Sequence, residues 1–312
     1  MYLSLDEAAE ILKKDGIVAI PTETVYGLAG NAYSETAVAK IFAVKERPFF
    51  DPLIVHIAEF SELENLAAEI PKNAKLLAEK FWPGPLTLVL PKKEKVPDLT
   101  TGGLSTVAVR MPKKQIARDI IKLAGFPLAA PSANMFQHLS TTKAEHVFEQ
   151  LGNRIDGIVD GGDCEVGIES TVIGFEKETP VMYRPGAITS EMIKEYLGFK
   201  TTPHSPLPTP HVSPGLLQKH YSPNTPLYIE LPSEVPPNSG LLAFGKLPAN
   251  SEKFSKILNL SESENPTEAA ANLYKMLHSL DSSVSVIFAT LLPKTGLGNA
   301  INDRLTKAAG GA

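Results

Sequence analysis

Short apolar runs alternate with amphipathic stretches along the first 200 residues. The runs have strand length and are rich in Val, Ile, Leu and Ala: IVAIP (17–21), PLIVHI (52–57), TLVL (87–90), TVAVRM (106–111), PLAAP (127–131), DGIVD (156–160) and STVIGF (170–175). Apolar runs of about four to eight residues between turn signals are typical of buried strands. Strands and helices mixed in this way predict an α/β domain built on a twisted mixed sheet.

The amphipathic stretches carry signals for helix ends. Ser4 and Glu7 have the spacing of a capping box, and Gly16 is expected to stop this first helix. Ser34 is expected to cap a second helix, which Pro48 ends. Apolar residues at intervals of three and four predict further helices near 71–80, 115–124 and 142–151.

Residues 201–226 interrupt this pattern. The segment holds seven prolines, which lack a backbone donor and fix φ, so an extended connector with polyproline character is expected. After it come strand-like runs, a helix over about 266–280, the strand VSVIFAT and a final helix. The expected organisation is a first domain over 1–200, a proline-rich linker or lid over 201–226, and a smaller, Rossmann-like α/β domain over 227–312.

Composition and charge narrow the possible classes of protein. The 312 residues are 43% hydrophobic and 21% charged, as in ordinary globular proteins, and the formal net charge is -5. A protein that grips nucleic acid mainly by electrostatics needs a basic footprint, so that class is disfavoured. No apolar run approaches the roughly 20 residues of a membrane span, and no secretory signal is evident, so a cytoplasmic protein is expected. Cys164 is the single cysteine, which excludes an intramolecular disulfide.

Common phosphate-binding and nucleophile motifs are absent from the sequence, including G-x-x-x-x-G-K-[ST], H-E-x-x-H and G-x-S-x-G. Any nucleotide site must therefore be assembled from scattered residues. Four cations stand beside turns at the ends of predicted helices or strands, namely Lys45, Arg47, Arg110 and Arg184. Because guanidinium groups grip phosphate oxygens bidentately and lysine acts as a point charge, together these residues suit a phosphate-binding cleft.

Hydroxyl and amide side chains accompany the cations at similar positions. The ends of strands are where α/β proteins commonly bind ligands, and such groups can hydrogen-bond a small polar molecule. They are Thr22, Thr24 and Tyr26 of PTETVYGL (21–28), Ser132 and Asn134 of PSAN (131–134), and Ser170 with Thr171 after a glycine-rich loop.

Each of these residues, taken alone, also has an ordinary structural explanation. Lys45 and Arg47 at a helix end would interact favourably with the macrodipole, by about 0.3–1 kcal/mol. His56 at the end of an apolar run is typical of a hydrogen-bonded core histidine. Thr22 and Thr24 could bond locally within a turn. Only the combination favours a ligand site.

The motifs PTETVYGL, K-x-R-P followed by PLIVH, FWPGPLT, TVAVR, PSAN, ESTV and RPG occur in one order. This set resembles the threonylcarbamoyl-AMP synthase family with its YrdC-like domain, and SPGLLQKHYSP with GLGNAINDRL resembles the longer, two-domain form. The resemblance implies a nucleotidyltransferase with a basic cleft that converts L-threonine, bicarbonate and ATP into threonylcarbamoyl-adenylate and pyrophosphate. A separate transferase complex would pass the product to adenosine 37 of tRNAs reading codons that begin with A. Direct tRNA binding by this chain would be weak or absent.

Carried over motif by motif, the resemblance implies two groups of site residues. Those expected near threonine are Thr24, Tyr26, His56 and Ser170. Those expected near ATP, with Mg²⁺ on its phosphates, are Lys45, Arg47, Asp51, Arg110, Ser132, Asn134, Arg184 and Tyr221. Lys45 and Arg47 would position phosphates and neutralise charge, and Tyr221 would fold over the cleft as part of a lid. Whether Arg110 or Arg184 contacts phosphate stays open, and no general base is assigned.

Some positions depart from the family pattern. Asp51 stands where asparagine is usual, so it either ligates magnesium or pairs with Arg47. Met135 to Gln137 replace a usual Ser-Gly after PSAN, and Leu216 replaces a common methionine. Two other functions compete: a non-catalytic RNA-binding module for ribosome maturation, which the net charge disfavours, and a hydrogenase-maturation carbamoyltransferase. The latter is disfavoured because its cysteine-rich and acylphosphatase-like regions are absent from the sequence.

Overall fold

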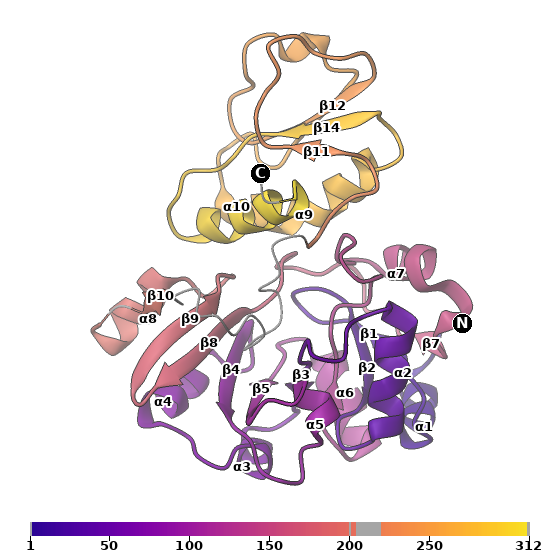
Figure 1. Ribbon diagram of the computed structural model, residues 1–312, viewed down its shortest axis with the longest axis vertical. Coiled ribbons are helices and arrows are strands. Elements are labelled where there is room, and N and C mark those ends of the chain that lie inside the picture. The colour runs from indigo at the N-terminus through magenta and orange to yellow at the C-terminus, as the bar shows by residue number, and fades with distance from the viewer. Residues whose placement is uncertain (1, 200, 204–219, 311–312) are drawn as a thin grey trace.

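Two sheets and the helices around them make up residues 2–199, 201–203 and 220–310, which the computed structural model describes (Figure 1). The strands of the larger sheet are β1 (Val18–Ile20), β2 (Gly27–Asn31), β3 (Ile54–His56), β4 (Leu86–Pro91), β5 (Thr106–Arg110), β6 (Leu128–Ala129), β7 (Gly157–Ile158), β8 (Thr171–Glu176), β9 (Thr179–Arg184) and β10 (Thr202–Pro203). The helices of this part are α1 (Leu5–Lys13), α2 (Glu35–Lys45), α3 (Leu63–Leu66), α4 (Lys72–Phe81), α5 (Asp98–Thr101), α6 (Gln115–Ala124), α7 (Ala144–Leu151) and α8 (Ser190–Leu197), with 3-10 turns η1 (Phe60–Glu62) and η2 (Gly152–Arg154). The smaller unit contains β11 (Leu227–Tyr228), β12 (Ser239–Ala243), η3 (Ser251–Lys253), β13 (Lys256–Asn259), α9 (Pro266–Leu280), β14 (Val286–Ala289) and α10 (Leu297–Ala308).

The larger sheet is mixed and the smaller one is parallel. The ten strands of the first lie in the order β10-β9-β8-β4-β5-β3-β6-β2-β1-β7, with parallel and antiparallel neighbours. The four strands of the second lie in the order β11-β14-β12-β13, and all their pairs are parallel. The predicted mixed α/β fold and the second, Rossmann-like α/β unit are therefore confirmed.

The first helix shows which local signals are reliable. The Ser4 hydroxyl accepts a hydrogen bond from the Glu7 backbone, and the Glu7 carboxylate accepts one from the Ser4 backbone, so the predicted capping box is confirmed. The helix ends just before Gly16, as expected, and the Gly16 N–H donates to the Ile11 carbonyl at 2.9 Å, but the left-handed residue at this end is Asp15, with φ at 58°. Gly16 is required for a different reason. A Cβ there would lie 2.3 Å from Ile11 Cγ2 and 2.9 Å from Asp156 Oδ2.

Two strands lie in segments for which the sequence predicts no strand. β2 continues from PTETVYGL, and β9 carries Arg184 at its end. Both lie inside the sheet, β2 between β1 and β6 and β9 between β8 and β10. Because each strand is bonded on both edges, pairing with neighbours overrides the weak local propensity of Gly-rich or Pro-flanked sequence.

Much of the predicted proline-rich connector, including Leu216, falls within 204–219 and so outside the described residues. The described helices include none that is long and apolar enough to cross a membrane.

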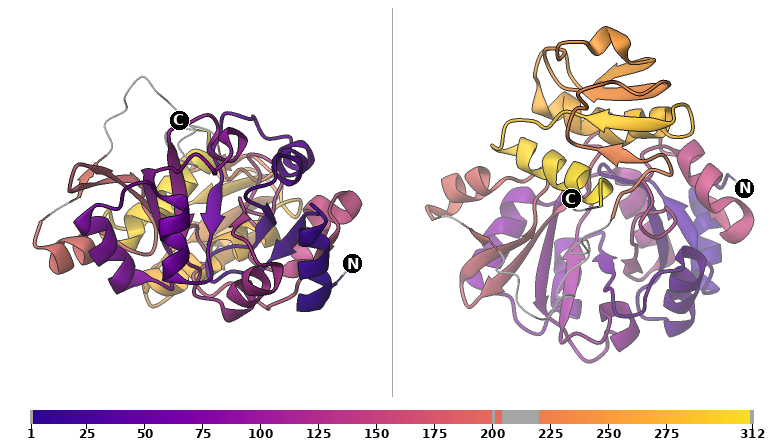
Figure 2. Two further views of the ribbon diagram at one scale, coloured as in Figure 1. Left: turned by 90° about the horizontal axis from the view of Figure 1, so that it is seen from below. Right: turned by 45° about the horizontal axis from the view of Figure 1, so that its top comes forward.

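Helices α9 and α10 lie between the small sheet and the large unit (Figures 1 and 2). One buried apolar cluster joins the two parts, since Val25, Leu139 and Ile168 of the large unit pack with residues of α9 and α10. Gly167 allows the close approach, because a Cβ there would lie 2.4 Å from the backbone oxygen of Ala270 in α9. The small unit is thus packed directly against the loop that leads into β8.

Candidate active site

Strand register brings polar side chains from separate motifs into one row. β5 lies between β3 and β4, so Arg110 is paired with His56 on one side and with Thr87 on the other. Directly paired residues point to the same face of a sheet, so these three side chains are neighbours. Beyond β4, the Thr87 and Ser170 hydroxyl oxygens are 2.7 Å apart, and Arg184 donates to Ser170 through Nε (3.0 Å to the carbonyl) and Nη2 (3.1 Å to Oγ).

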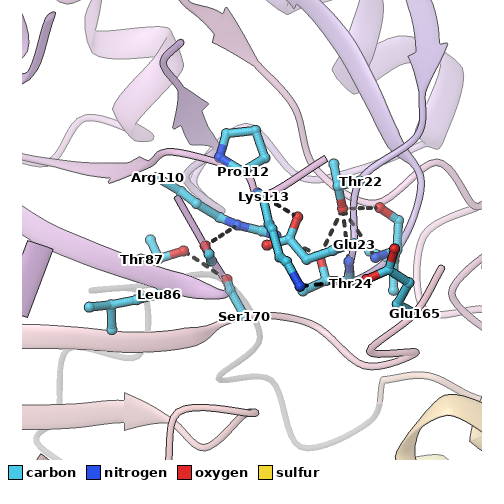
Figure 3. Close-up of polar contacts among 12 residues, drawn as sticks. Thr22, Glu23, Thr24, Leu86, Thr87, Arg110, Pro112, Lys113, Glu165 and Ser170 are labelled. Carbon is cyan, nitrogen blue, oxygen red and sulfur yellow. Dashed lines mark hydrogen bonds and ion pairs between the residues drawn. The ribbon is translucent and has the colours of Figure 1, made fainter. Parts of the chain in front are cut away.

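Arg110 is held in place by the PTETVYGL segment (Figure 3). Its Nη2 lies 2.6 Å from Glu23 Oε1, and its Nη1 donates to Thr24 Oγ1 at 2.8 Å. The other Glu23 oxygen accepts from the Lys113 backbone at 3.0 Å. Thr22 bonds locally to the Val25 carbonyl at 2.6 Å, as the structural explanation of this turn predicts. Thr24 therefore faces the row of polar side chains, while Thr22 shapes the turn.

Lys45, the last residue of α2, and Arg47, two residues later, bond to different partners. The Lys45 ammonium donates to the carbonyls of Ser132 (2.6 Å) and Asn134 (2.5 Å), so it pins the PSAN loop. Arg47 donates to the carbonyls of Asp51 and Pro52 and forms a 2.9 Å ion pair with Asp51 Oδ1. Of the two expectations for Asp51, the structure shows the pairing with Arg47. The second oxygen of Asp51 is buried and has no protein partner among the described residues.

These elements enclose a cleft whose empty volume, open solvent included, is about 560 Å³. Eight of the twelve residues predicted for the site line it, and the other four do not. The eight are Thr24, Arg47, His56, Arg110, Ser132, Ser170, Arg184 and Tyr221.

The four predicted residues outside the lining lie behind the wall of the cleft. Lys45 and Asp51 hold the loops described above, and Asn134 donates to the carbonyls of Met135 and His138. Tyr26 is fully buried, and its hydroxyl bonds with Asp160, Gly161 and Gly162. In this structure these side chains support the cleft from behind.

Burial sets the charge states of several groups. Burial and the charge of Arg110 lower the pKa of His56 to about 3, so its imidazole is neutral at physiological pH. Burial and the neighbouring Arg47 hold the pKa of Lys45 well below its usual range. The pKa of Arg47 is also lowered by burial, although Asp51 opposes this shift. A polyanionic ligand would stabilise the charged forms of both cations.

The chain just before the small unit closes one side of the cleft. His220 and Tyr221, which follow the undescribed segment, line it beside Glu169. The Tyr221 ring lies 5.5 Å from the Arg304 guanidinium of α10 and 6.1 Å from the Tyr274 ring of α9. Tyr221 is 1% exposed, and its hydroxyl has no protein partner among the described residues. Among the same residues there is no group of three or more His, Cys, Asp or Glu that could hold a metal ion.

Comparison with known proteins decides the family. A family model for Sua5, YciO and YrdC proteins, described as telomere recombination, matches residues 10–186, and a model described as threonylcarbamoyl-AMP synthase, C-terminal domain, matches 188–310. Proteins named threonylcarbamoyl-AMP synthase from Pyrococcus abyssi and Bacillus subtilis are each 42% identical. Their alignments cover 97% and 98% of this chain and 93% and 92% of those proteins. The chain belongs to the threonylcarbamoyl-AMP synthase family.

Solved structures agree with this membership. Pyrococcus abyssi Sua5 complexed with L-threonine is 39% identical, with a TM-score of 0.88 over 98% of this chain and 94% of that chain. Escherichia coli YciO is 24% identical, with a TM-score of 0.51 over 58% of this chain and 88% of that chain, and shares the fold. The catalytic interpretation is thus favoured over the RNA-binding one.

Sequence reasoning missed three charged residues of this synthase-family cleft. Glu23 and Glu169 stand inside the motifs PTETVYGL and ESTV, and Arg304 stands in GLGNAINDRL. All three are at least 95% buried. The two acids could have been recognised from the sequence, because each stands in a motif of apolar and hydroxyl residues, and a buried acid needs a cationic partner. What the sequence does not reveal is which cation each acid meets.

Proposed function

We propose that this chain makes threonylcarbamoyl-AMP and pyrophosphate from L-threonine, bicarbonate or CO₂, and ATP. The observation that carries the proposal is one cleft that combines three arginines with hydroxyls and a neutral histidine. It occurs in a chain that belongs to this synthase family. The L-threonine complex of the related Pyrococcus abyssi protein supports threonine as the substrate.

In this proposal the cleft has two regions. Thr24, His56 and Ser170 bind threonine, with Tyr26 supporting them from behind. Arg47, Ser132 and Arg184 face ATP, while Lys45, Asp51 and Asn134 fix the loops that present these groups. Arg110 lies in the threonine region, because it bonds Thr24 and neighbours His56.

The chemistry needs alignment more than a covalent nucleophile. The threonine amine captures CO₂ as a carbamate, a carbamate oxygen attacks the α-phosphorus, and pyrophosphate leaves. Fixed cations stabilise the charge that develops on the phosphates. Mg²⁺, which we propose arrives with ATP, would supply further Lewis-acid stabilisation. His220 and Tyr221 exclude water, which would otherwise hydrolyse the mixed anhydride.

We further propose that the product passes to a separate tRNA threonylcarbamoyl transferase complex. A net charge of -5 gives little support for strong tRNA binding by the chain itself.

The test is pyrophosphate release by the purified chain, with threonine, bicarbonate or ATP omitted in turn and the product identified by mass spectrometry. Release should require all three substrates. Arg47→Ala and Arg184→Ala should each reduce it by about 10²-fold or more, because each removes a cation from the cleft. Arg154→Ala is the control, since this arginine is exposed, and its contacts with Glu46 (3.5 Å) and the Met135 sulfur (3.2 Å) involve no residue that lines the cleft. Equal ATP turnover without threonine would refute the proposal.

A further inference from the structure

Glu169 is an acid in a cleft that otherwise suits an anion. It lines the cleft directly before Ser170 and is 5% exposed. A carboxylate at this position should repel ATP phosphates, since charges interact strongly where little water intervenes. It should also compete for Arg184, which bonds the neighbouring Ser170. The structure shows what prevents both effects.

The carboxylate of Glu169 is turned towards the small unit. Oε1 accepts from Ser140 Oγ at 2.5 Å and from the Tyr274 hydroxyl at 3.0 Å. Oε2 accepts from Tyr274 at 3.1 Å and from Arg304 Nε at 3.0 Å. Thus α9 and α10, the two helices between the small sheet and the large unit, each supply one donor to a single acid of the cleft.

The charge of Glu169 is fully compensated in this arrangement. Burial raises the pKa of the carboxyl, but the charges of Arg304 and Arg184 and the Ser140 hydrogen bond outweigh it and bring the pKa to about 2. The acid is therefore ionised and paired at neutral pH. Arg304 is 1% exposed, and its Nη1 also donates to the Pro185 carbonyl at 2.7 Å, one residue from Arg184.

We propose that Arg304 and Tyr274 are positioning residues of the active site. They hold the Glu169 carboxylate against the small unit, so that Arg184 can bind the ATP phosphates instead of pairing with Glu169. This gives the C-terminal unit a role in substrate binding. The inference rests on the proposed function, since it assumes that ATP occupies the cleft.

A simpler alternative is that Arg304 only fastens the two units together. The two explanations differ in what Glu169→Gln does to an Arg304 variant. If Arg304→Met binds ATP weakly because the charge of Glu169 is no longer compensated, removing that charge restores ATP binding. If Arg304→Met binds ATP weakly because the two units are no longer joined by this contact, the double variant lacks the same contact and binds ATP as weakly as the single variant.

The experiment measures affinity by calorimetry, with threonine and an ATP analogue that carries a methylene bridge between its α and β phosphorus atoms. Arg304→Met should bind the analogue at least about tenfold more weakly, because one buried negative charge then faces the phosphates. Glu169→Gln/Arg304→Met should return to within about threefold of the unmodified chain. Lys275→Met is the control, because its 3.9 Å ion pair with Asp163 joins the two units through exposed side chains and does not involve Glu169.

The pH dependence gives a second readout that fastening alone would not change. Without Arg304, the pKa of Glu169 rises, so the affinity ratio between Arg304→Met and the unmodified chain should shrink as the pH falls from 8 towards 5.5. A folded Arg304→Met with unchanged affinity would overturn the inference, as would a double variant as weak as the single one.

If Arg304→Met does not fold, the affinity of the double variant for the ATP analogue tests the inference by itself. Binding within about threefold of the unmodified chain supports the inference, and weaker binding overturns it. Failure of the proposed function is distinguishable, because the unmodified chain would then lack threonine-dependent pyrophosphate release or would not bind the analogue at all.

Discussion

At the scale of single residues, the cleft is built from buried charges held in pairs. Glu23 with Arg110 and Asp51 with Arg47 are ion pairs of 2.6 and 2.9 Å, with all four side chains no more than 5% exposed. Desolvation makes each such charge costly unless its partner is present. The pairs therefore fix where the guanidinium groups lie before any ligand binds, and that pre-organisation favours binding.

Removal of Glu23 tests this principle. Glu23→Ala should lower the free energy of unfolding by about 3–5 kcal/mol, because it leaves the buried Arg110 unpaired. It should also reduce threonine-dependent pyrophosphate release, because Arg110 loses its fixed orientation. Urea unfolding and the release assay measure the two effects.

Glu165→Ala is the matched control, since Glu165 pairs with Lys113 at 3.8 Å at the surface (Figure 3). Its effect should stay within about 0.5 kcal/mol. A Glu23→Ala protein as stable as the control would show that Arg110 does not depend on this partner.

At the scale of elements, α9 and α10 join the small unit to the cleft. α9 supplies Tyr274 and α10 supplies Arg304. A polar contact of Asn302 holds α10 in place. The Asn302 side chain accepts from the Leu292 backbone N–H and donates to the Leu292 carbonyl, both at 2.9 Å. This pair ties the loop after β14 to α10 and so helps to set the position of Arg304.

Asn302→Asp should be strongly destabilising although it is nearly isosteric. One carboxylate oxygen would face the Leu292 carbonyl in a site where the side chain is 7% exposed, leaving that acceptor unsatisfied. We expect a loss of about 2–3 kcal/mol in the free energy of unfolding, measured by urea titration.

The same change at the exposed Asn299 of α10 serves as the control and should cost less than about 0.5 kcal/mol. Equal stability of the two variants would mean that the Leu292 contact contributes nothing.

At the scale of the whole molecule, packing suppresses the protonation of buried histidines. Burial and Arg110 lower the pKa of His56 to about 3. For His220, burial and the charges of Arg47 and Lys45 outweigh the opposing charge of Glu169 and also give a pKa of about 3. The unfolded chain binds protons on both histidines near the usual pKa of about 6.5.

Stability should therefore fall on acidification. Above about pH 6.5 each histidine leaves the free energy of unfolding at its full value. As the pH falls from there towards 3, the free energy of unfolding decreases, because only the unfolded state takes up the proton. Each can add a slope of up to about 1.4 kcal/mol per pH unit. His56→Gln should flatten the pH dependence of the unfolding free energy between pH 6 and 4, measured by urea titrations. Identical slopes with and without His56 would contradict the expectation.

The elements predicted well are those whose signals are local. The predicted helix 266–280 matches α9, which begins after the capping Asn265, and the predicted helix 115–124 matches α6, which Gly125 ends. β2 and β9 were missed because only their neighbours in the sheet make them strands. The same limit applies to the site. Eight residues of the predicted set line the cleft, but no spacing in the sequence separates Arg47, which faces it, from Lys45, which lies behind its wall.

The sequence by itself determined the alternation of strands and helices, the two α/β units and the residue types suited to phosphate and threonine, because helix caps, apolar periods and motif chemistry act over a few neighbouring residues. The tertiary structure alone decided the partners of the buried charges. Glu169 and Arg304 are 135 positions apart in the chain, yet they lie 3.0 Å apart where α10 meets the loop before β8. A buried charge must find its counter-charge wherever packing places it, and local sequence does not encode that distance.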